Sequence, residues 1–205
     1  MENVTARREI RRAAGWEEAA MGSRVTVFGS SRLTEAEPGY EEARRLGRLL
    51  AQAGYGICTG GYAGAMEAVS RGAREAGGTA IGITVEPWSR RLTPNAWLTQ
   101  EVVTPHLFER LRRLMEGDAF VALPGGPGTL GEVALAWNLF QTESMATRPL
   151  VLVGRQWRTL VRCMEAGLRV EPRDLALLQF AETVDGVLPL LPGRPDARDR
   201  KASPP

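Results

Sequence analysis

Short runs of apolar, β-branched residues alternate with segments of helical periodicity along most of this chain. Three of the apolar runs read RVTVFG, YGICTGG and TAIGITV and occupy residues 24–29, 55–61 and 79–85. Between the first two, residues 40–54 place apolar side chains at the three- and four-residue spacing of one helix face. Strands that are apolar throughout are expected where helices cover both faces of a parallel sheet. The alternation therefore predicts an open, doubly wound α/β fold with a mostly parallel sheet and helices on both faces.

The same pattern continues to about residue 191 and fits one domain of ordinary size. Further strands are expected at 101–104, 118–124, 148–154 and 176–182. Further helices are expected at 64–78, 106–117, 128–142 and 157–167, with a last short helix at 183–191 that Pro189 breaks. We expect a single nucleotide-binding domain at 23–191, a flexible or helical leader at 1–22, and a disordered tail at 192–205.

The scarcity of lysine, histidine and cysteine excludes several chemistries. Of the 26 basic residues, only Lys201 is a lysine, and it lies in the polar tail. A reaction that needs a buried lysine is therefore excluded. His106 is the only histidine, and Cys58 and Cys163 lack the spacing of metal ligands. No metal site is expected.

Charge and hydropathy also limit the partners and the compartment. The formal net charge is +2, which is too small to indicate a nucleic-acid partner. No run approaches the roughly 18 apolar residues of a membrane span, and the N-terminus lacks the apolar core of a secretory signal. We expect a cytoplasmic protein with no membrane partner.

Three loops rich in glycine or serine follow expected strands. They read GSS at 29–31, TGGYAG at 59–64 and PGGPGT at 124–129. The carboxyl ends of strands in a doubly wound sheet meet at one edge, where ligands bind. Glycine lets a phosphate or ribose approach the backbone, and a helix N-terminus offers N–H groups to an anion. The loops predict an anion site, although the lysine of a Walker loop is missing.

The carboxylate of Glu132 has two interpretations. It stands three residues after Thr129, which is the spacing of a capping box in which each side chain bonds the other's backbone N–H. Alternatively, it points away from its own helix into the expected site. The spacing favours neither.

Four motifs together resemble the LOG family, once described as lysine decarboxylase-like. VTVFGSS, TGGYAGAMEAVSRGA, the arginine-bearing LFERL and LPGGPGTLGE follow one another in the order and spacing of that family, over roughly residues 24–185. The resemblance implies a Rossmann-like fold and hydrolysis of the N-glycosidic bond of a nucleoside 5′-monophosphate. The substrate would be a cytokinin ribotide or AMP, and the products free base and ribose 5-phosphate. It also implies a homodimer and no cofactor.

The resemblance implies roles for particular residues. The family's PGGxGTxxE glutamate matches Glu132, and its site arginine matches Arg110, with Arg113 as the alternative one turn later. Glu132 would stabilise an oxocarbenium ion, and Arg110 would hold the phosphate or polarise the leaving base. The expected binding residues are Gly29, Ser30, Ser31, Gly60, Gly61, Gly125, Gly126, Gly128 and Thr129.

This chain departs from the family pattern at two places near the expected base site. Thr59 and Glu67 replace glycines of the usual GGGxxGLMG, and GITVEPW replaces GVIP. The base preference is therefore left open. Trp88 and Trp97 lie in the loop that follows, where packing is favoured over stacking on a base.

Two functions other than hydrolysis are associated with sequences of this kind: decarboxylation and carriage of a cofactor. A decarboxylase using pyridoxal phosphate needs a lysine inside the fold, and this chain offers none there. Relatives with the same fold carry the molybdenum cofactor without catalysis and tend to read GGGxGT, whereas Pro124 precedes the glycines here. A non-catalytic binder of nucleotide or molybdenum cofactor is thus the alternative.

Overall fold

The computed structural model describes residues 23–193, which form a seven-stranded sheet with every pairing parallel. The strands are β1 (Arg24–Phe28), β2 (Gly56–Thr59), β3 (Ala80–Val85), β4 (Gln100–Thr104), β5 (Ala119–Ala122), β6 (Leu150–Val153) and β7 (Gln179–Ala181). Their order in the sheet is β4-β3-β2-β1-β5-β6-β7. The predicted doubly wound fold is confirmed, with a sheet that is parallel throughout.

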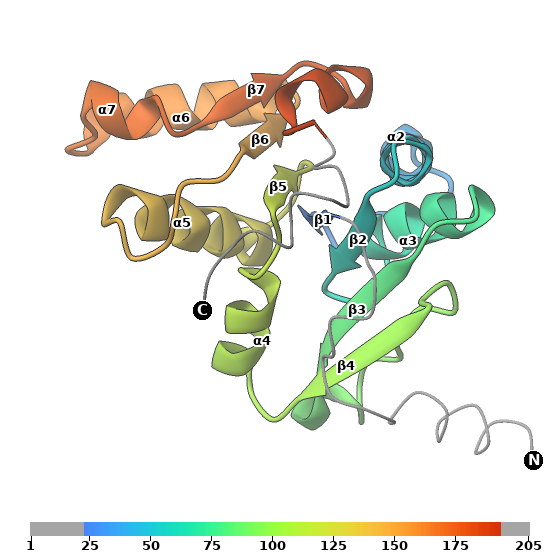
Figure 1. The fold of residues 1–205 in the computed structure, drawn as a ribbon. Coiled ribbons are helices and arrows are strands. Elements are labelled where there is room, and N and C mark those ends of the chain that lie inside the picture. The colour runs from blue at the N-terminus through green and yellow to red at the C-terminus, as the bar shows by residue number, and fades with distance from the viewer. Residues whose placement is uncertain (1–22, 194–205) are drawn as a thin grey trace, which may run out of the picture.

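Helices cover both faces of this sheet (Figure 1). They are α2 (Pro38–Gln52), α3 (Ala65–Glu75), α4 (Leu107–Leu114), α5 (Pro127–Gln141), α6 (Arg155–Gly167) and the short α7 (Pro172–Leu175). One buried cluster joins α2 and α3 to one face of the sheet, and a second joins α4, α5 and α6 to the other. Strand alternation divides the two, since Val25 and Val27 face the first cluster and Phe28 the second.

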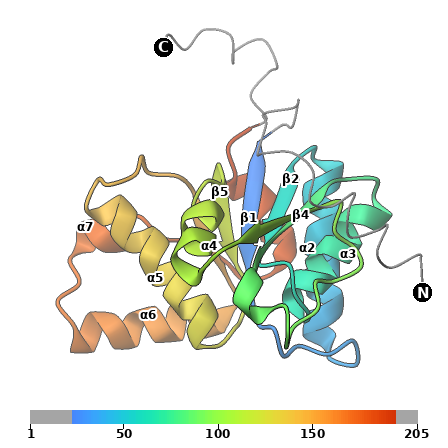
Figure 2. The same ribbon diagram turned by 90° about the horizontal axis from the view of Figure 1, so that it is seen from below.

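The chain reverses its direction of travel across the sheet between β1 and β5. From β1 it winds outward to the edge strand β4, and α4 then returns it to β5 beside β1. Figure 2 shows α4 lying across the middle of the sheet, between α5 and the α2–α3 pair. Ligands of doubly wound folds bind outside the carboxyl ends of the strands at such a reversal. The loops after β1 and β5 meet there, where the Leu123 N–H donates to the Phe28 carbonyl at 2.9 Å.

Some expected elements differ from the structure. Residues 183–191 form two separate 3₁₀ turns, η2 (Val184–Gly186) and η3 (Leu188–Leu190), instead of the expected short helix broken at Pro189. Proline at position 189 has no N–H to continue a helical ladder. The expected loop after β3 begins with another 3₁₀ turn, η1 (Glu86–Trp88), and α7 was not predicted. The expected leader at 1–22 and residues 194–205 of the expected tail lie outside the described residues.

Among residues 23–193, no helix has the length and apolar character needed to cross a bilayer.

Two glycines let α2 and α3 pack with their backbones in close approach. A Cβ atom on Gly47 would lie 2.0 Å from the Val69 carbonyl oxygen, and one on Gly72 would lie 1.8 Å from the Arg44 carbonyl oxygen. Backbone atoms cannot move aside as a flexible side chain can. The close pairing of these helices therefore depends on having glycine, which has no side chain, at both positions.

We expect Gly72→Ala to lower the free energy of unfolding by about 3 kcal/mol, because the added methyl overpacks the helix contact. Gly131→Ala in α5 is the matched control, since a Cβ there meets nothing within 4 Å. That variant should gain about 0.5–1 kcal/mol from helix propensity. Urea unfolding measures both, and equal stability of the two variants would contradict the close helix contact.

Candidate functional site

The side chain of Glu132 does not cap the N-terminus of α5, the helix that carries it. Gly126 precedes the helix, and no side chain caps the N–H groups there. Thr129 is buried, with its hydroxyl against the backbone of Gly125, where a Cβ would lie 2.2 Å from Oγ1. The capping box is therefore not formed, and the alternative orientation of Glu132 holds: its Oε1 accepts from Nη1 of Arg110 at 3.3 Å.

Arg110 reaches this carboxylate from α4 and is fixed by two backbone carbonyls. Its Nε donates to the Ile83 carbonyl at 2.9 Å, and Nη2 donates to the Gly60 carbonyl at 3.4 Å. A Cβ on Gly60 would lie 1.9 Å from Nη2, so a side chain at that position would expel the guanidinium. The glycine expected to approach a ligand thus makes room for Arg110.

Arg113, the alternative site arginine, lies elsewhere on α4. It pairs with Glu109 at 3.0 Å and with Glu116 at 3.6 Å along the helix surface. The structure therefore brings Arg110 and Glu132 together. The catalytic roles of both residues stay predictions.

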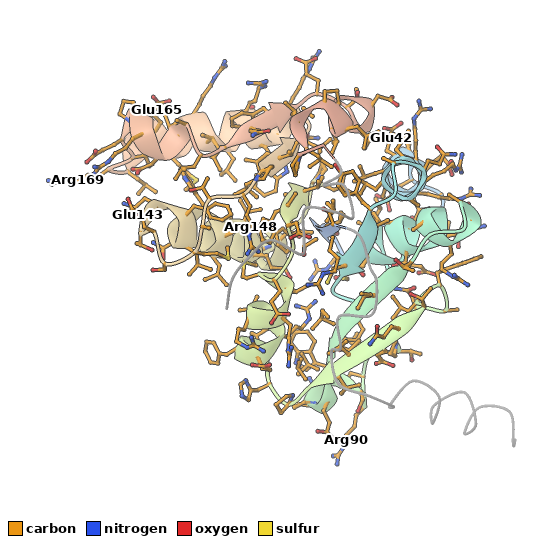
Figure 3. The ribbon with its side chains drawn as sticks, viewed as in Figure 1. Glu42, Arg90, Glu143, Arg148, Glu165 and Arg169 are labelled. Carbon is orange, nitrogen blue, oxygen red and sulfur yellow. The ribbon has the colours of Figure 1, made fainter. Side chains whose placement is uncertain are left out.

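Arg110 is buried and Glu132 is mostly shielded from solvent, unlike many charged side chains of residues 23–193. Figure 3 shows Glu42, Arg90 and Glu165 projecting outward from the molecule, where they are exposed. The side chains of Arg110 and Glu132 are only 7% and 13% exposed. Burial raises the pKa of the Glu132 carboxyl above its usual range, while the charge and hydrogen bond of Arg110 oppose that rise. Arg110 is thus the group that favours an ionised carboxylate at this place.

The other expected residues after β1 and β2 lie at the carboxyl edge of the sheet. Gly29, Ser30 and Ser31 follow β1, and Gly60 and Gly61 follow β2. The Ser30 hydroxyl accepts from the Arg32 N–H at 3.1 Å, so it also holds its own turn.

Gly126 and Gly128 are glycines that packing does not require. A Cβ at either position would meet nothing within 4 Å, and both residues are exposed. The first turn of a helix leaves N–H groups without intrahelical acceptors, and a side-chain-free surface there lets an anion reach them. Their placement is therefore compatible with the predicted phosphate contact.

Tyr62 belongs to this neighbourhood although the sequence reasoning passed over it. It is 5% exposed, and its ring centroid lies 6.0 Å from Cζ of Arg110. The available signal was an aromatic residue placed directly after two glycines of a loop already assigned to the site.

The chain is similar in sequence to a known protein family. The family model described as the SLOG cluster4 family matches residues 23–153, which hold every site residue named above. The chain belongs to the SLOG cluster4 family. Its similarity to curated relatives also confirms the resemblance to the LOG family.

Two curated relatives have names that describe nucleotide chemistry. A cytokinin riboside 5′-monophosphate phosphoribohydrolase of Mycobacterium tuberculosis is 35% identical over 117 residues, covering 56% of this chain and 62% of the relative. A pyrimidine/purine nucleotide 5′-monophosphate nucleosidase of Escherichia coli is 29% identical over 140 residues, covering 63% of this chain and 30% of the relative. The matches thus span less than two thirds of each relative's length.

A solved structure of similar fold is named as a carrier protein and not as a hydrolase. The Moco carrier protein of Chlamydomonas reinhardtii superposes with a TM-score of 0.63 at 28% identity, covering 82% of this chain and 94% of the carrier. The fold is therefore shared by proteins named for catalysis and for carriage.

Arg110→Met tests whether the guanidinium holds the Glu132 carboxylate in its buried place. Removing one partner of a buried ion pair is expected to lower the free energy of unfolding by about 3–5 kcal/mol at pH 7. In the variant, the native pKa of Glu132 rises further above its unfolded value. The native state then binds more protons than the unfolded chain, so stability falls as pH rises between those two values.

The deficit of Arg110→Met against the wild type should therefore be smaller at pH 5 than at pH 7, measured by urea unfolding. Adding the same substitution to Glu132→Gln is the control, because no carboxyl titrates there and the deficit should not change with pH. An equal deficit at both pH values in the wild-type background would rule out the coupling.

Proposed function

We propose that this protein hydrolyses the N-glycosidic bond of a nucleoside 5′-monophosphate to free base and ribose 5-phosphate. The observation that carries the proposal is the buried Arg110–Glu132 pair, joined from α4 and α5 beside the glycine loops. The names of the two curated relatives support the same reaction class. The substrate is a cytokinin ribotide or an AMP-like nucleotide, and the cytoplasm and a homodimer are proposed with it.

The reaction adds water across the bond between C1′ and the base. As the C1′–N bond breaks, its electrons leave with the base and positive charge develops on C1′ and the ring oxygen. The ionised Glu132 stabilises that charge and orients the water. The water oxygen bonds to C1′, one of its protons is released, and the base takes up a proton. No cofactor takes part in this proposal.

Arg110 and the first turn of α5 both offer N–H donors to the nucleotide. A guanidinium has five N–H donors, and three of those of Arg110 are used by Ile83, Gly60 and Glu132. One N–H on each Nη is left to hold the phosphate or polarise the leaving base. Backbone N–H groups near Gly126, Gly128 and Thr129 bind the 5′-phosphate, and Ser30 and Ser31 hydrogen-bond the phosphate or the base.

Glu132→Gln tests the proposed catalytic carboxylate. The amide keeps the size of the side chain and can still accept from Arg110, so fold and nucleotide binding should persist. Base release should fall by a factor of about 10² or more, since a main electrostatic stabilisation of the cation is lost. HPLC of base released from AMP, isopentenyl-AMP and a panel of other nucleoside monophosphates measures the rate.

Arg113→Met and Arg110→Met form a matched pair in this assay, because both remove a guanidinium from α4 one turn apart. Only Arg110→Met should slow base release strongly. Unchanged turnover by Glu132→Gln would refute the assigned mechanism.

A second candidate is a non-catalytic carrier of nucleotide or molybdenum cofactor. It is favoured by the match to 94% of the Moco carrier's length. Wild-type protein that retains a pterin fluorophore through purification, and releases no base from any monophosphate, would support the carrier instead.

A further inference from the structure

Two aromatic rings lie against the guanidinium of Arg110. Its Cζ lies over the Trp88 ring at 5.5 Å from the centroid and over the Tyr62 ring at 6.0 Å. The two rings are themselves in contact, with centroids 5.9 Å apart and planes inclined by 43°. Trp88 ends the 3₁₀ turn after β3, and Tyr62 follows the two glycines after β2.

Hydrogen bonds hold these two segments together. The Val85 N–H donates to the Tyr62 hydroxyl at 2.9 Å, immediately before the turn that carries Trp88. Asn95 is buried, and its Nδ2 donates to the Tyr62 carbonyl at 3.1 Å while its backbone N–H donates to the Gly61 carbonyl at 2.9 Å. The loop after β3 is thus fastened to the loop after β2, and the rings have fixed places.

The rings complement the hydrogen bonds of Arg110. Acceptors can reach a guanidinium only around its edge, and here they are the Ile83 and Gly60 carbonyls and the Glu132 carboxylate. The flat faces offer no donor, and aromatic faces attract a cation placed over them. A tilt of the guanidinium would lengthen the 3.3 Å contact to Glu132.

We propose that Trp88, with Tyr62, is a positioning residue that holds the guanidinium of Arg110 in the orientation in which it pairs with Glu132. Trp88 acts through Arg110 and needs no contact with the substrate. The importance of this role for turnover rests on the function proposed above. The position of Arg110 itself does not.

Glu132 is the group that reports where Arg110 lies. Among the described residues, Arg110 is the charged side chain that acts on its carboxyl. The Cys58 thiol and the Tyr62 hydroxyl also lie in the field of Arg110, but burial raises the pKa of Cys58 to about 12 and raises that of Tyr62. Both stay neutral where Glu132 titrates, so a displaced guanidinium would show as a higher pKa of Glu132.

Trp97 provides a matched control. It lies in the same loop, and its ring also receives an arginine, with Cζ of Arg71 at 5.1 Å from the centroid. Arg71 pairs with Glu75 and Glu35 on the surface. Trp97→Leu therefore removes a tryptophan and a cation–π contact from this loop without touching Arg110.

The decisive experiment follows the Glu132 carboxyl by NMR in protein labelled with ¹³C at the glutamate side-chain carboxyl. The resonance is assigned by its loss in Glu132→Gln. Trp88→Leu should move its titration midpoint to higher pH, Trp88→Phe should stay closer to the wild type because a ring remains, and Trp97→Leu should not move it. Circular dichroism checks folding, and Trp88→Met, which also removes the ring, serves as the test variant if Trp88→Leu does not fold.

Kinetics give the second readout. Trp88→Leu should lower kcat about tenfold with little change in KM, as expected for loss of one cation–π contact that orients a catalytic group. The acidic limb of its pH–rate profile should move to higher pH. A midpoint unchanged in the folded variant that lacks the ring would overturn the proposal. If wild-type protein releases no base, the proposed function fails while the NMR titration still decides the role of Trp88.

Discussion

A buried guanidinium requires acceptors for its donors and a counter-charge, and this requirement shapes the carboxyl edge of the sheet. Arg110 receives the counter-charge from Glu132 and further acceptors from the Ile83 and Gly60 carbonyls. Position 60 is a glycine, and no side chain would fit there beside Nη2 of Arg110. Removing water from an ion pair is costly unless such partners are present. The conformations of the chain at the ends of β2 and β3 therefore help to stabilise the buried charge of Arg110.

The topology of the sheet explains why this pair forms between α4 and α5. Both helices lie on the same face and begin at the carboxyl edge, α4 after β4 and α5 after β5. Arg110 is in the first turn of α4 and Glu132 is in the second turn of α5. Residues in the early turns of two such helices lie near the same edge although β5 separates them in the sequence. The reversal between β1 and β5 places the glycine loops beside them.

The parts of this arrangement that depend on local pattern could be predicted, and those that depend on tertiary contact could not. Apolar runs and their turns located all seven strands and the glycine loops. The choice between a cap and a site for Glu132 stayed open, because the Thr129 spacing satisfies both and only Arg110 decides it. The motif favoured Arg110 over Arg113, but both lie on one helix, and only the burial of Arg110 and the surface pairing of Arg113 separate them.

The same distinction explains the smaller differences. The segment at 183–191, expected to be a short helix broken at Pro189, forms two 3₁₀ turns, since a proline limits continuous hydrogen bonding. Tyr62 was passed over because nothing in the chain around it indicates contact with a helix about 50 residues later. Packing was the favoured fate of Trp88, and the structure packs it against Arg110 itself.

The choice of arginine over lysine at the buried position follows from the same geometry. One planar group here donates in three directions at once and still lies against two aromatic rings. A lysine ammonium is a compact, strongly hydrated charge, and burial lowers its pKa, so it would be prone to lose the proton that favours an ionised Glu132. Arginine keeps its charge when buried. A fold whose only lysine stands at position 201 can therefore still maintain a permanent positive charge beside a buried carboxylate.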